Sequence, residues 1–194
     1  MVSPYADTFV LLTPLNLLVS LLLVSIYQQP KDINFSLFLI LAGLFGFIIE
    51  VLGTKTGFIF GQYTYGATLG LKILDTPLTM CINWACLMFC ILMFINNINY
   101  RLNNYLKSFF GAFLMVFMDI FIEPVAVKFD FWSWKSEGIN SFLVAPLQNY
   151  LAWFVIAFIL YLFLTPLLHY YQNKAAVRLL YLQFIFFAGL NITY

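Results

Sequence analysis

Six apolar runs dominate this chain of 194 residues. They cover residues 8–27, 35–52, 77–95, 105–122, 150–168 and 176–190. A helix rises about 1.5 Å per residue, so runs of about 20 residues match the ~30 Å hydrocarbon core of a bilayer. Hydrophobic residues make up 63% of the chain and charged residues only 9%, a balance typical of membrane proteins. The sequence predicts an all-α fold, a polytopic membrane bundle of about six transmembrane helices that forms a single domain over residues 1–194.

The loops between these runs differ in length and charge. Segments 28–34, 96–104 and 169–175 are short, whereas segments 53–76 and 124–149 are long and aromatic. Six spans would place both long loops and both termini on one side of the membrane. The basic residues of the short-loop side outnumber its one acid, Asp32; they are Lys31, Arg101, Lys107, Lys174 and Arg178. On the other side lysines and acids balance, so the positive-inside rule predicts that the short loops are cytoplasmic.

The fourth run ends in two carboxylates, Asp119 and Glu123, followed at once by Pro124. Residues four apart project from one face of a helix. The residue before a proline is disfavoured in the α region, so we expect the helix to end near Glu123. An acid at mid-bilayer costs roughly 2.5 to 3.5 kcal/mol on insertion scales, so intramembrane acids usually face a protein interior and mark a site. The pair predicts the centre of an active site, in preference to a purely structural acid pair.

The first long loop is rich in glycine and aromatic residues. Its glycines recur at Gly53, Gly57, Gly61 and Gly66, but polar and aromatic residues between them do not fit an apolar helix-dimerisation face. We expect the glycines to permit tight turns that aim the aromatic side chains inward. These side chains are Phe58, Phe60, Tyr63 and Tyr65. For the tyrosines, an aromatic belt at the membrane interface is an equally favoured alternative.

The chain re-enters the membrane in a similar way after each long loop. Pro77 precedes Asn83 and Trp84, and Pro146 precedes Gln148, Asn149 and Trp153. An acid also precedes each loop, Glu50 in the first case and Glu123 in the second. The similarity indicates a degenerate internal repeat related by an axis along the membrane normal. Such a repeat would gather six polar residues at one membrane face: Glu50, Asn83, Asp119, Glu123, Gln148 and Asn149.

Several other kinds of site are disfavoured by the composition. His169 is the one histidine of the chain, which excludes a histidine-cluster iron site. Cys81, Cys86 and Cys90 lack metal-type spacing and are interpreted as small packing residues. We therefore predict no metal. The formal net charge of +1 gives no reason to expect a nucleic acid partner.

Several of these segments are similar to the carotenoid biosynthesis protein family, whose characterised members include carotenoid hydratases. The similar segments are Glu50 with Gly53, residues 57–65, 77–84, 119–134 and 146–150. The resemblance implies a membrane lyase without a cofactor, which adds water to the terminal double bond of an acyclic (ψ) carotenoid end and leaves a tertiary alcohol. It also implies a lipophilic carotenoid substrate, other carotenoid biosynthesis enzymes as partners, and a place in the bilayer of a bacterial or archaeal cytoplasmic membrane.

The residues themselves are suited to this chemistry. Two neighbouring acids at low dielectric do not easily both ionise, so one can act as general acid and the other as general base. The predicted catalytic residues are Asp119, Glu123 and Glu50. Aromatic faces can stabilise a cation by about 2 kcal/mol each when desolvated. The predicted substrate-binding residues are Asn83, Trp84, Phe131, Trp132, Trp134, Tyr63, Tyr65, Gln148, Asn149 and Trp153.

Two other functions remain open at this point. A small proton-coupled lipid or terpenoid transporter would also keep acids inside its bundle, although it would expose them to both sides in turn. A non-catalytic carotenoid- or quinone-binding subunit would use the same aromatic residues, yet it would need no close acid pair.

Overall fold

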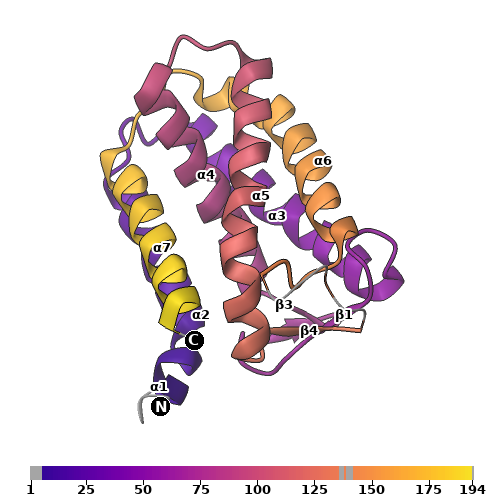
Figure 1. Ribbon diagram of the computed structural model, residues 1–194. Coiled ribbons are helices and arrows are strands. Elements are labelled where there is room, and N and C mark those ends of the chain that lie inside the picture. The colour runs from indigo at the N-terminus through magenta and orange to yellow at the C-terminus, as the bar shows by residue number, and fades with distance from the viewer. Residues whose placement is uncertain (1–5, 136–137, 139–141, 194) are drawn as a thin grey trace.

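The computed structural model describes residues 6–135, 138 and 142–193. The elements are α1 (Ala6–Leu11), α2 (Thr13–Ile26), α3 (Ile33–Thr56), β1 (Tyr63–Tyr65), β2 (Lys72–Ile73), β3 (Thr76–Pro77), α4 (Thr79–Asn99), α5 (Asn104–Lys128), β4 (Trp132–Trp134), α6 (Leu147–Leu164), η1 (Thr165–Leu168) and α7 (Lys174–Thr193). Within the described residues, five helical segments are long and apolar enough to cross a membrane: α3, α4, α5, α6 with η1, and α7. The predicted all-α membrane bundle is confirmed (Figure 1).

The first predicted span, 8–27, is divided into two helices. α1 ends at Leu11 and α2 begins at Thr13, with Pro14 in its first turn, where a proline is tolerated because that N–H has no helical partner. α2 has 14 residues, so it is about 21 Å long and shorter than the other spans. It is the sixth apolar helix of the described chain, below the length that crosses a typical bilayer.

α4 is the central helix of the bundle. It is the most buried of the five long spans and packs against α2, α3, α5 and α7. Every residue from Trp84 to Met93 is buried, as expected for a helix that is apolar on all sides. Beside it, α5 and α6 form the closest helix pair, and Tyr161 of α6 donates from its hydroxyl to the Met88 carbonyl of α4 at 3.0 Å. The core is therefore built around α4, with the other helices exposing an apolar face.

The long loops and the short loops lie at opposite ends of the bundle. α1, the end of α7 and both strand pairs lie at one end, and the connections α2–α3, α4–α5 and η1–α7 lie at the other (Figure 1). This agrees with the grouping expected from the loop lengths. At the short-loop end, Asp32 caps α3 by accepting from the Phe35 N–H at 3.1 Å, and Asn103 caps α5 by accepting from the Leu106 N–H at 2.9 Å.

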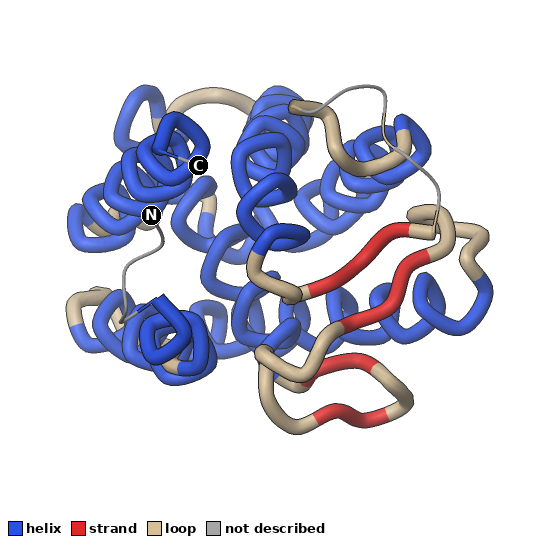
Figure 2. The backbone as a smooth tube through the Cα atoms, turned by 60° about the horizontal axis from the view of Figure 1, so that its bottom comes forward, coloured by secondary structure: helices blue, strands red, loops and turns tan. Residues whose placement is uncertain are grey.

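The two long loops are joined by a short antiparallel ribbon of β1 and β4 (Figure 2). The register pairs Tyr63 with Trp134, Thr64 with Ser133 and Tyr65 with Trp132. Side chains alternate between the faces of a strand, so the four rings share one face and the two hydroxyls share the other. The hydroxyls of Thr64 and Ser133 are exposed and lie 3.1 Å apart. We predicted neither strand from the sequence.

The expectation that the fourth helix ends near Glu123 is wrong. α5 continues to Lys128 with Pro124 inside it. A proline removes one backbone N–H and crowds the preceding turn, but neighbouring helices can satisfy the freed carbonyls in membrane proteins. Pro124 leaves the Ile120 carbonyl without its helical donor, and the Phe121 carbonyl beside it accepts from the Asn191 side-chain amide of α7 at 2.8 Å. The extra turn carries the chain beneath Glu123 before it returns as β4.

The expectation that glycine turns aim the aromatic side chains of the first long loop inward is confirmed for three of the four. Gly57, at φ 63°, ends α3 in the left-handed conformation that glycine adopts without strain. The residues that follow turn Phe60, Tyr63 and Tyr65 into the interior, as expected, and their burial excludes an interfacial belt for these tyrosines. The expectation for Phe58 is wrong, because its side chain is 85% exposed at the tip of the turn.

Candidate active site

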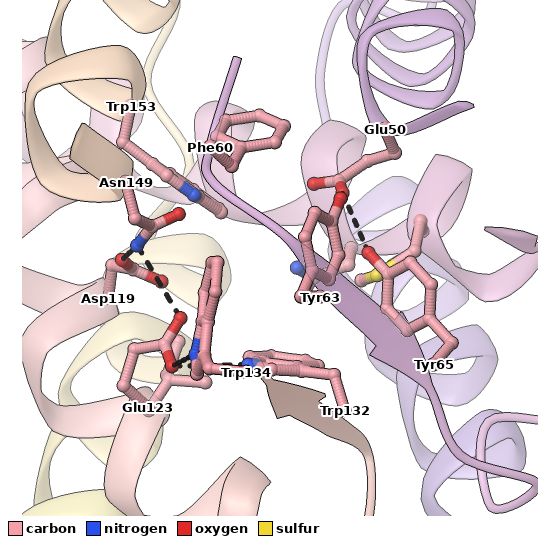
Figure 3. A pocket seen from close by; sticks show the side chains of 13 residues that line it. Glu50, Phe60, Tyr63, Tyr65, Asp119, Glu123, Trp132, Trp134, Asn149 and Trp153 are labelled. Carbon is pink, nitrogen blue, oxygen red and sulfur yellow. Dashed lines mark hydrogen bonds between the residues drawn. The ribbon is translucent and has the colours of Figure 1, made fainter. Parts of the chain in front are cut away.

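A small pocket lies where the two long loops fold against the ends of α3, α4, α5 and α6 (Figure 3). Its volume is about 30 Å³, which is room for one or two water molecules. Acidic, amide, aromatic and apolar side chains line it: Glu50, Phe60, Tyr63, Tyr65, Met80, Asn83, Asp119, Ile122, Glu123, Trp132, Trp134, Asn149 and Trp153. Three carboxylates and no basic residue stand among these lining side chains.

Glu50 accepts hydrogen bonds from three donors. The hydroxyls of Tyr63 and Tyr65 both donate to its Oε2 at 2.7 Å, and the indole N–H of Trp84 donates to its Oε1 at 2.9 Å. Burial, followed by the charge of Glu50, raises the pKa of Tyr63 and of Tyr65 well above the ordinary value, so both phenols keep their protons. An indole N–H can only donate. All three partners therefore stabilise a charged carboxylate at Glu50.

The three hydrogen bonds can offset the cost of burying this charge. A hydrogen bond to a charged group contributes roughly 1.5 to 3 kcal/mol, so three contribute on the order of 4.5 to 9 kcal/mol. The effective penalty for burying an ion is several kcal/mol. Glu50 is only 4% exposed and has no cation among its hydrogen-bond partners. The carboxylate is thus held by neutral donors, which is the arrangement that oxyanion sites use.

Asp119 and Glu123 form a second acidic centre on α5, and their donors are unequal. The Asn149 amide donates to Asp119 Oδ2 at 2.8 Å and lies 3.5 Å from Glu123 Oε1. Glu123 Oε2 also accepts from the indole N–H groups of Trp132 at 3.1 Å and Trp134 at 2.8 Å. Both carboxyls are at least 98% buried. Because two close buried carboxylates repel, the pair favours sharing one proton, and the two indole donors favour the charge on Glu123.

The β1–β4 ribbon connects the two acidic centres. Tyr63 and Tyr65 of β1 bind Glu50, while Trp132 and Trp134 of β4 bind Glu123 (Figure 3). The rings also contact each other, with Tyr63 and Trp134 centroids 5.0 Å apart and Tyr65 and Trp132 centroids 6.0 Å apart. One face of a six-residue ribbon therefore supplies four of the donors to the two centres.

A stacked pair of indoles lies on the opposite side of the pocket, with Trp153 in the lining and Trp84 behind it. Trp84 of α4 and Trp153 of α6 lie 4.5 Å apart, centroid to centroid, with 16° between their planes. Trp84 is fully buried behind the lining and packs on Gly46, where an added Cβ would lie 2.3 Å from the indole Cγ. Gly46 is required here because no side chain fits between α3 and this indole.

The structure brings together ten of the thirteen residues predicted for the site. Of the rest, Trp84 acts behind the pocket through Glu50, as described above. Gln148 and Phe131 lie outside the lining: the Gln148 amide donates to the Phe58 carbonyl at 2.5 Å, and Phe131 is buried where its carbonyl accepts from the Gly66 N–H at 2.9 Å. Phe60, Met80 and Ile122 were not predicted as site residues. Phe60 had a sequence signal in the glycine-bounded segment, whereas Met80 and Ile122 are indistinguishable from other apolar helix residues.

Comparison with known proteins assigns the family. A model of the family described as carotenoid biosynthesis protein matches residues 11–194. The chain belongs to this family. The resemblance noted from segments between residues 50 and 150 is thereby confirmed, and the match extends it to nearly the whole chain. No solved structure matches it.

One curated protein is similar in sequence to part of this chain. It is the bisanhydrobacterioruberin hydratase of Haloarcula japonica, which is 28% identical over 127 residues. The match covers 63% of this chain and 42% of the relative, so the chain spans less than half of the length of the curated protein that it matches.

Proposed function

We propose that the protein is a carotenoid hydratase, a lyase that adds water to the terminal double bond of an acyclic carotenoid end and forms a tertiary alcohol. The observation that carries the proposal is the buried pair of Asp119 and Glu123 with unequal donors in an aromatic pocket. Membership of the carotenoid biosynthesis family and the similarity to a curated hydratase support the substrate class and the reaction.

The unequal donors assign the roles of the two acids in this proposal. Asp119, with one amide donor, holds the shared proton and is the general acid. It protonates the alkene carbon that bears one hydrogen, and the carbon that bears two methyl groups becomes a tertiary cation. Glu123, held as a carboxylate by two indoles, takes a proton from the water whose oxygen bonds to that cation.

The cycle closes without an external proton. After addition, Glu123 carries the proton that came from water and Asp119 is ionised. Transfer of that proton from Glu123 to Asp119, one helical turn away on the same face of α5, restores the starting state. The net change is the addition of one water across one double bond, so no redox cofactor takes part.

Water and substrate have different requirements at this pocket. The cavity of about 30 Å³ has room for water but is smaller than a branched five-carbon end group. Asn83 lines the pocket with no hydrogen-bond partner among the described side chains, so its amide is available to hold the attacking water. The end group enters when the ring walls of the β1–β4 ribbon move apart. The alternative of a transporter requires access from both membrane faces, whereas all three acids lie at one end of the bundle.

The origin of the oxygen atom tests the proposal. Purified protein is incubated with a ψ-end carotenoid without oxygen, added metal or reductant, in water labelled with heavy oxygen. We expect the label in a tertiary alcohol. A product that forms only in air, or that carries its oxygen from the gas phase, would overturn the hydratase assignment. Accumulation of unchanged carotenoid bound to the protein would favour the binding subunit instead.

A further inference from the structure

We infer that the pocket is a cation-binding site in which Glu50 is a permanent anion that does not transfer protons. The ligand class is a tertiary carbon or nitrogen cation at the end of an isoprenoid chain. The statement that such a cation forms during the reaction rests on the proposed function, because hydration creates it. The statement that the pocket binds such a cation rests only on the side chains that line it.

Glu50 differs from the acid pair in its hydrogen bonding. Both of its oxygens are occupied by donors, with two phenols on Oε2 and one indole on Oε1. Three of its four lone-pair positions are taken by donors, and a proton on the one that remains, at Oε1, would weaken all three charge-assisted bonds. Glu123, in contrast, is neutralised when it takes the proton from water. Glu50 is therefore the carboxylate that stays charged from protonation of the alkene to capture of the cation.

The surroundings of Glu50 favour a cation over a neutral ligand. Tyr63, Trp132, Trp134 and Trp153 present rings to the same small space, and π faces attract cations. Two separate carboxyl centres face it from α3 and α5, and no lysine, arginine or histidine lines it among the described residues. All three carboxyl side chains are buried, so these attractions act at low dielectric, where they are strongest.

Tyr63, Tyr65 and Trp84 then act as positioning residues. Each holds the charge on Glu50, and none is needed for proton transfer in the proposed reaction. Their contacts with Trp134, Trp132 and Trp153 tie the carboxylate to the walls that would surround the ligand. Loss of one phenol is expected to weaken cation binding without removing the acid pair.

Two isosteric ligands test the inference directly. One is a short isoprenoid chain that ends in trimethylammonium, and the other is the same chain ending in tert-butyl, which has the same shape and no charge. Affinities are measured by calorimetry on protein in lipid nanodiscs. We expect wild-type protein to bind the ammonium ligand at least tenfold more tightly. Glu50→Gln should reduce this preference at least tenfold, while the exposed control Asp75→Asn leaves it unchanged.

Each outcome bears on the inference. A folded Glu50→Gln protein that keeps the preference overturns the inference, and so does a loss of the preference in the exposed control Asp75→Asn. If Glu50→Gln does not fold, Tyr65→Phe replaces it: a severalfold smaller preference supports the inference and an unchanged one overturns it. The heavy-oxygen experiment remains separate. A protein that prefers the ammonium ligand but forms no alcohol would refute the hydratase function while keeping the cation site.

Discussion

The substitution Asp119→Asn removes the proton of the proposed general acid and leaves the shape of the site almost unchanged. The carbonyl oxygen of the new amide can still accept from the Asn149 amide, which lies 2.8 Å from Asp119 Oδ2. The free energy of unfolding should therefore change by about 1 kcal/mol or less, the net value of one neutral hydrogen bond. General acid catalysis contributes roughly 10²- to 10⁴-fold, so turnover should fall by this factor, equivalent to about 2.7 to 5.5 kcal/mol in the barrier.

The assay follows formation of the alcohol by chromatography and compares protein accumulation and thermal unfolding in the same detergent. Glu123→Gln should show the same pattern, because its carbonyl oxygen can accept from both indoles in place of Oε2. Glu50→Gln should impair turnover less than either, and Asp75→Asn, on the exposed hairpin, should have no effect. Near-normal turnover in Asp119→Asn or Glu123→Gln would remove the pair from the mechanism and leave Glu50 as the better candidate for the acid.

Three further predictions concern topology, packing and pH. Reporter fusions after Lys31 and after Lys72 should report opposite sides of the membrane, cytoplasmic and then external; the same side for both would contradict the span boundaries. Gly111→Ala should lower the unfolding temperature, because the added Cβ would lie 2.6 Å from the Tyr161 ring; the matched Gly189→Ala, with nothing within 4 Å, should raise it slightly through helix propensity. The hydrogen bond and charge of Lys55 lower the pKa of Asp75. This ion pair therefore stabilises the fold at pH values above the ordinary aspartate pKa of about 3.9. Its contribution is lost as the pH falls through the lowered pKa of Asp75. Asp75→Asn and wild-type protein should differ slightly in unfolding temperature at neutral pH and converge in strong acid, and a difference that grows on acidification would contradict this sign.

The helices and the acids could be predicted from the sequence because both signals are local. An apolar run of about 20 residues predicts a membrane span, and two carboxylates four residues apart predict a shared helix face, each from one segment alone. The grouping of Glu50 with Asp119 and Glu123 followed from similar re-entry patterns after the two loops. The pocket contains all three acids, so their proximity was correctly inferred, although the inferred repeat itself stays a prediction.

The errors arose where a distant partner decides the local structure. Pro124 predicts a helix end, yet α5 continues to Lys128 and packs against α7, whose Asn191 amide donates to the Phe121 carbonyl. β1 and β4 have three residues each and pair Thr64 with Ser133 across 69 positions, which leaves no local strand pattern. The donors on Glu123 could not be assigned without this pairing, because the sequence does not show which face of β4 points to α5.

The register of the ribbon also limits how the two long loops can change in length. Because side chains alternate along a strand, inserting one residue between Tyr63 and Tyr65 would turn one of the two phenols to the outer face, where Thr64 now lies. An odd insertion between Trp132 and Trp134 would do the same to an indole that binds Glu123. Insertions are thus expected to be tolerated in parts of the long loops outside these six positions, and a single inserted residue within either strand should disconnect one acid from its donor.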